Sequence, residues 1–143
     1  MFVFQSNCYV YKTGSWRTGP AMVQAINHFA MTKSPFTNKP QSLFVTGGAD
    51  NSWSYANAEI LTDNGWEVFS PSFPVPVYVH CMVLVNSTTV MVAGGIQNGL
   101  TLADTYLISD DKKVTMNSYL QQTHLTRWLV FNVLNIIVLG YNK

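Results

Sequence analysis

An apolar run that ends on two consecutive glycines occurs twice in this chain. The runs are LFVT (43–46) before Gly47 and Gly48, and VMVA (90–93) before Gly94 and Gly95. The two glycine pairs are 47 residues apart. A feature that returns at a fixed step is typical of tandem repeats, so the chain is predicted to contain similar units that stack on one another.

Two tryptophans keep a similar step. Trp16 and Trp66 are 50 residues apart. Each lies five residues after a bulky side chain, which is Tyr11 in the first case and Leu61 in the second. Since Trp16 precedes the first glycine pair, the chain is predicted to start partway through a unit. Residues 8–27 are then the end of a preceding unit.

Two histidines open the predicted strands before the glycine pairs. His28 and His80 are 52 residues apart, and an insertion at residues 33–41 explains the longer step. These landmarks divide the middle of the chain into one unit at residues 28–79 and a second at residues 80–119.

A third unit is predicted less completely. His124 would open it, and Gly140 lies 46 residues after Gly94, but the second glycine of the pair is replaced by Tyr141. Residues 120–143 are therefore either the start of a further unit or an unrelated tail.

Within one unit the pattern predicts four short β-strands at residues 28–33, 42–46, 58–62 and 66–70. Four strands, a double glycine and a later tryptophan at this period resemble the kelch repeats of β-propellers. The resemblance extends from Cys8 to about Asp111 and implies an all-β fold. That fold is a partial kelch-type β-propeller made of four-stranded antiparallel blades, with about two complete blades and a need for further blades to close the ring.

The glycine pairs, Gly47 with Gly48 and Gly94 with Gly95, are interpreted as structural. Each ends an apolar strand that should be covered on both faces, where only glycine accepts a positive φ and a close backbone approach. A phosphate-binding loop would need a following helix and usually a lysine, and neither follows these pairs.

The other landmark side chains are also assigned structural roles. The resemblance implies that Trp16 and Trp66 pack between adjacent blades, in preference to stacking on a sugar. His28 and His80 are expected to be hydrogen-bonded structural histidines, because equivalent positions on a ring do not converge on a metal. By the same argument Glu59 and Asp104 are expected to bind backbone or neighbouring side chains, and Asn86 to shape a turn instead of carrying a glycan.

Composition excludes several classes of partner. Eight Lys plus Arg against seven Asp plus Glu give a formal net charge of +1 without charged runs, so neither nucleic acid nor a membrane is expected as a partner. Cys8 and Cys81 are too far apart in sequence for a zinc pair or a disulfide framework. No cofactor or metal is predicted. The compartment stays open: the cytoplasm is favoured, and an N-terminus further upstream would allow the extracellular space.

Up-and-down strands bring the long loops at residues 49–57 and 96–103 to one face, bordered by the connections at residues 19–27 and 70–79. Aromatic side chains in a polar loop are typical of binding hot spots. The predicted partner-binding residues are Trp53, Tyr55, Asp50, Asn51, Gln97, Asn98 and Tyr78. An alternative role for Trp53 is packing, in which its side chain folds back over the edge of the blade and does not contact a partner. The two connections contain no arginine between residues 20 and 28 or 74 and 80.

The resemblance implies a protein–protein interaction module without catalytic residues, such as a fragment of a substrate-adaptor or actin-associated kelch protein. Two alternatives stay open. The first is a fragment of a galactose-oxidase-like copper enzyme, whose tyrosine, histidine and cysteine ligands cannot be assigned here. The second is a nonfunctional truncated product.

Overall fold

The structure, a computed structural model, describes residues 6–37, 42–70, 72–111, 114–117, 131–133 and 136–138. The regular elements in these ranges are all β-strands, without a helix, which confirms the all-β prediction. These strands form two four-stranded antiparallel sheets and three two-stranded hairpins.

The first large sheet is a meander in which each strand pairs with the next one along the chain. Its strands are β3 (Ala30–Lys33), β4 (Leu43–Thr46), β5 (Ala58–Thr62) and β6 (Gly65–Phe69). The four predicted strands of this unit are present, with bounds shifted by at most two residues. The first strand begins at Ala30 because His28 has a φ of 53°, which a β-strand cannot continue.

The second large sheet repeats the meander. Its strands are β7 (Cys81–Asn86), β8 (Thr89–Ala93), β11 (Thr105–Ser109) and β12 (Val114–Asn117). In the turn between β7 and β8, Asn86 Oδ1 accepts hydrogen bonds from the backbone N–H and the hydroxyl of Thr88, at 2.8 and 3.0 Å. Asn86 therefore shapes the turn, as predicted.

Three short hairpins accompany the large sheets. They are β1 (Tyr9–Lys12) with β2 (Ser15–Thr18), β9 (Ile96–Gln97) with β10 (Leu100–Thr101), and β13 (Phe131–Val133) with β14 (Ile136–Val138). The β14 strand lies next to β7. The predicted third unit depends on His124, Gly140 and Tyr141, which lie outside the described residues.

The two large sheets share one pairing register. Ala58 lies opposite Thr46 in the first sheet, and Thr105 lies opposite Ala93 in the second. Both members of the second pair are 47 residues further along the chain, the step that separates the glycine pairs. The sequence period is thus a repeat of backbone pairing.

The β1–β2 hairpin repeats the pairing of β5 with β6. Tyr11 lies opposite Trp16, and Leu61 lies opposite Trp66. The five-residue spacing read from the sequence is therefore the spacing across a hairpin turn.

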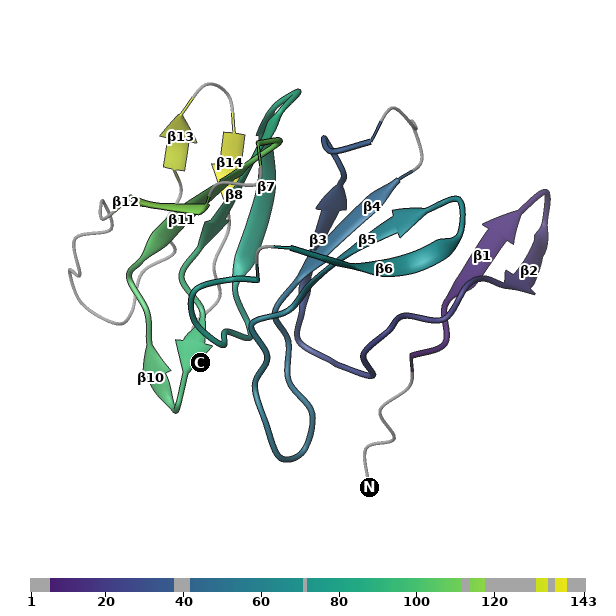
Figure 1. Cartoon of the computed structure of the whole chain (residues 1–143), viewed down its shortest axis with the longest axis horizontal. Helices are drawn as coiled ribbons and strands as arrows, with labels where there is room; N and C mark the ends of the chain where they lie inside the picture. Colours follow the sequence, from purple (N-terminus) through teal and green to yellow (C-terminus); the bar gives the residue numbers. More distant parts are fainter. Residues whose placement is uncertain are drawn as a thin grey trace.

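The core lies between the two large sheets, which meet along β3 and β7. Figure 1 shows β7 and β3 in the middle, with the rest of the second sheet on one side of them and the rest of the first sheet on the other. Consecutive residues of β4 point into different clusters: Phe44 packs with Phe69 in the cluster between the sheets, whereas Val45 packs with Met22 on the other face. A strand covered on both faces explains why its sequence shows no polar alternation.

A connecting segment, residues 72–79, joins the two sheets and packs between the glycine pairs. Gly47 and Gly48 have φ of 59° and 102°, and Gly94 and Gly95 have 65° and 103°. A Cβ on Gly47 would overlap the carbonyl oxygen of Val77, and one on Gly95 would lie 2.5 Å from Val77 Cγ2. The pairs thus have the positive φ that was predicted, and the close approach comes from the connecting segment.

Candidate functional site

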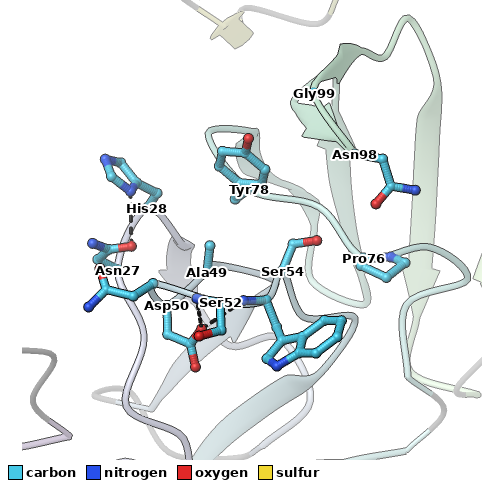
Figure 2. Close-up of a pocket in the computed structure, with 12 residues that line it drawn as sticks. Asn27, His28, Ala49, Asp50, Ser52, Ser54, Pro76, Tyr78, Asn98 and Gly99 are labelled. Carbon is cyan, nitrogen blue, oxygen red and sulfur yellow. Dashed lines mark hydrogen bonds between the residues drawn. The ribbon is translucent and has the colours of Figure 1, made fainter.

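A hollow of about 780 Å³ opens where the loop at residues 49–54 faces the turn between β9 and β10. Residues 27–28 form one border of the hollow, and Pro76 and Tyr78 from the connecting segment also line it. Figure 2 shows Asp50 on one side and the Asn98-Gly99 turn on the other, with Tyr78 between them.

Backbone hydrogen bonds fix the walls of the hollow. Asn27 and Ala49 exchange two N–H···O bonds of 2.9 Å, and Tyr78 and Ile96 exchange the equivalent pair at 3.2 and 2.8 Å. The Val79 N–H donates to the His28 carbonyl at 2.9 Å and so ties the connecting segment, just before β7, to the start of the first unit. The surface is therefore built on ordered backbone instead of free loops.

Asp50 organises the aromatic loop. Its Oδ1 accepts the backbone N–H groups of Ser52 and Trp53 at 2.7 and 2.8 Å, and its Oδ2 accepts the Tyr55 hydroxyl at 2.5 Å. The Asp50 N–H in turn donates to the Trp53 carbonyl at 2.9 Å. The hydrogen bond from Tyr55, and then those from the two N–H groups, lower the pKa of Asp50, so the carboxylate is charged at neutral pH.

The two aromatic residues predicted to bind a partner differ in role. Trp53 lines the hollow with 72% of its surface exposed, so the alternative in which it folds back over the blade edge does not hold. Tyr55 is partly buried against the cluster of Met22 and Val45, and its hydroxyl binds Asp50. Tyr55 therefore supports the loop, and Trp53 is the exposed aromatic group.

The other predicted site residues divide in the same way. Asn51, Tyr78 and Asn98 line the hollow together with Asp50 and Trp53. Gln97 does not line it, because it lies in β9 opposite Leu100.

Sequence analysis did not predict seven of the lining residues, which are Asn27, His28, Ala49, Ser52, Ser54, Pro76 and Gly99. Their signal was present in part, since Asn27 and Pro76 lie in the connections that up-and-down strands should bring to this face. The β9–β10 hairpin was also missed, although Asn98-Gly99 is a strong two-residue hairpin signal and both residues have positive φ.

The pairing of His28 with His80 was wrong. Backbone bridges make Asn27 equivalent to Tyr78, a step of 51, so His28 corresponds to Val79 and His80 corresponds to Phe29. His28 and Val79 also share a positive φ, of 53° and 55°. A slip of one residue reverses the face of a strand, so the two side chains have different surroundings.

His80 is buried, whereas His28 is exposed on the rim of the hollow. The Nε2 of His80 is 2.8 Å from the Thr46 hydroxyl, and its Nδ1 has no hydrogen-bond partner among the described residues. Burial lowers the pKa of His80 to about 4, against a smaller opposing effect of Thr46, so it is neutral at pH 7. The structural role predicted for both histidines thus fits His80, while His28 bonds only Asn27 Oδ1 through its ring, at 2.9 Å.

The tryptophans also differ from each other. Trp66 is partly buried against Met22 and Ile26 from the connection that precedes its sheet. Trp16 is 70% exposed and packs on Tyr11, with 5.2 Å between ring centroids. Among the described residues, none packs on Trp16 as Met22 packs near Trp66, so the packing of Trp16 between blades stays a prediction.

The carboxylate of Glu59 is buried and bonded to backbone. It accepts the N–H groups of Val23 and Gln24 at 2.9 and 2.8 Å, as predicted. Asp104 accepts a hydrogen bond from Tyr106. The pKa of Tyr106 is raised mainly by burial and to a smaller extent by the nearby Asp104 carboxylate. Each carboxylate therefore has its own structural partner.

The remaining groups of interest are candidate metal ligands and the two cysteines. Within residues 6–37, 42–70, 72–111 and the short strands beyond, no three His, Cys, Asp or Glu side chains gather as metal ligands. Cys8 and Cys81 form no disulfide within the described residues, and burial raises the pKa of Cys81. In the part of the chain that the structure describes, no helix is long and apolar enough to cross a membrane.

Comparisons with known proteins show no family for this chain. No protein-family model matches it, and no curated protein is significantly similar to it in sequence.

Proposed function

We propose that the chain is part of a kelch-type β-propeller and that it recognises a protein partner through the hollow. Two features support the architecture. The two sheets have the same strand order and register, and their first strands, β3 and β7, lie against each other as inner strands do around an axis. The β14 strand, on a hairpin of its own, adds a further neighbour to β7.

A ring of this kind needs more blades than the chain contains. Propellers usually close with 4–8 blades, and repeats bury their faces only against neighbours. Met91 on β8 and Leu107 on β11 are only partly covered, whereas Phe44 and Val45 on β4 are buried. We expect further blades, from more of the same protein or from another chain, to cover these faces.

The observation that carries the functional proposal is Trp53. A large aromatic side chain with 72% of its surface in solvent is held by a loop in which Asp50 accepts hydrogen bonds from Ser52, Trp53 and Tyr55. A rigid loop loses little conformational entropy when it binds, and exposed tryptophans are enriched in interface hot spots. Within the described residues, this side chain lies largely outside the packed clusters.

Trp16 provides a matched control, because it is equally exposed, at 70%, and lies on the β1–β2 hairpin away from the hollow. A photo-cross-linking amino acid is introduced at position 53 in one variant and at position 16 in another. We expect the variant with the cross-linker at position 53 to capture specific protein species. The variant with the cross-linker at position 16 should capture none of these species. Equal labelling at both positions in correctly folded variants would refute recognition through the hollow.

A further inference from the structure

The hollow has a single fixed charge. Asp50 is the only carboxylate among the described residues that line it, and they include no lysine or arginine. His28 and Tyr78 are the other titratable groups in the lining. An acidic partner would therefore meet a negative surface, and a wholly apolar partner would desolvate the Asp50 charge without compensation.

Asp50 has capacity for one more donor. An ionised carboxylate has about four acceptor positions, and Ser52, Trp53 and Tyr55 fill three of them. These bonds also hold the group in its charged form. The carboxylate thus keeps its charge and one free acceptor position beside the hollow.

The backbone of Trp53, not its indole ring, is hydrogen-bonded to this carboxylate. Its own backbone N–H is bonded to Asp50 Oδ1 at 2.8 Å, so the ring and the charge are held in one hydrogen-bonded turn. Tryptophan is the aromatic side chain that best attracts a cation over its face. A guanidinium group is flat, stacks on such rings and donates to carboxylates in the same plane.

We propose that the hollow binds an arginine side chain of a partner peptide, with the guanidinium on the Trp53 indole and hydrogen-bonded to Asp50. This assignment rests on the proposed function and names the chemistry of the partner. Asn27, Ser54 and Asn98 supply amide and hydroxyl groups on the surrounding walls that can bind the peptide backbone. Figure 2 shows Asn27 and Asn98 on opposite sides of the hollow.

The probe is a random-peptide display library, panned against the full chain. We expect the selected peptides to be enriched in arginine and to lose binding to a Trp53→Ala variant. In a resynthesised peptide, replacing the arginine by citrulline keeps the shape but removes the charge, and the affinity should fall about tenfold or more, as expected for a desolvated cation–π contact with an ion pair.

Protein variants give the matching test. Asp50→Asn should weaken the arginine peptide about as much as citrulline does, while Trp16→Ala, which removes an exposed tryptophan away from the hollow, should leave the binding unchanged. Because Asp50→Asn could also disturb the loop, the citrulline peptide decides the question on unchanged protein.

The outcomes separate the two proposals. Peptides that need Trp53 but contain no basic residue, or that bind equally well with citrulline, would overturn the arginine assignment and leave partner recognition standing. Peptides that bind the Trp53→Ala variant as well as the native chain would contradict recognition through the hollow itself. A library that yields no binder would contradict both.

Discussion

Acid should destabilise this fold through His80. The ring is buried against Thr46 and has a pKa of about 4 in the folded protein, compared with 6.5 for an unperturbed histidine. Between these two pH values the unfolded chain binds a proton that the folded chain does not, so stability falls as the pH is lowered through this window and becomes constant again below it. From pH 7 to pH 4.5 the loss is about 2 kcal/mol, at about 1.4 kcal/mol for each pKa unit.

The assay is urea unfolding followed by far-UV circular dichroism at pH 7 and pH 4.5. Carboxylates titrate over part of the same range, so the native chain is compared with a His80→Gln variant, whose amide can still bond Thr46 but does not titrate. Between pH 7 and pH 4.5 the free energy of unfolding of the variant should fall by about 2 kcal/mol less than that of the native chain. An identical loss in the two proteins, or a His80 resonance that titrates near pH 6.5 by NMR, would refute the argument.

Three substitutions test other parts of the structure by thermal and urea unfolding. Gly47→Ala should cost about 3 kcal/mol of stability, since its Cβ would overlap the Val77 carbonyl. Gly94→Ala should cost about 1 kcal/mol, because Gly94 has a similar positive φ but its Cβ would lie 3.7 Å from the Leu102 carbonyl oxygen; equal costs would show that the close approach is absent. Val79→Asn should stabilise the chain by about 1 kcal/mol, because a β-branched residue is strained at a φ of 55°, and a loss of stability would contradict that strain. Glu59→Ala should cost about 2 kcal/mol by leaving two backbone N–H groups without an acceptor, against less than about 0.5 kcal/mol for the exposed Glu67→Ala.

The strands and their period could be predicted because they depend on local patterns. An apolar run covered on both faces, as at Phe44 and Val45, has no polar alternation, and glycine is the residue that best accepts the φ found at Gly47 and Gly94. A hairpin spacing such as Tyr11 to Trp16 is also local. These features carry their physical cause in the sequence itself.

Side-chain surroundings were predicted less well because they depend on the neighbouring unit. His28 and His80 look equivalent in sequence, yet the backbone step between the units is 51 rather than 52, and one residue moves a side chain to the opposite face. Trp16 and Trp66 have the same hairpin position, but only Trp66 has Met22 beside it. Neither difference is visible in a single repeat.

The candidate site was predicted as a region more accurately than as a set of residues. Alternating strand directions bring the loops at residues 49–57 and 96–103 to one face, and both contribute to the hollow. Trp53 is exposed, whereas Tyr55 supports the loop through the hydrogen bond from its hydroxyl to Asp50. That bond could not be read from spacing alone.

The stacking of the two units is the basis of the whole account, and amide hydrogen exchange measures it directly. The Gly48 N–H donates to the Val77 carbonyl at 2.8 Å and the Val79 N–H donates to the His28 carbonyl at 2.9 Å, so both bonds hold the connecting segment, which leads into the second sheet, against the residues around the first sheet. We predict that both amides exchange as slowly as the amides of the β4–β5 ladder. Fast exchange at Gly48 and Val79, while the ladder amides stay protected, would show that the sheets fold without stacking and would contradict the account.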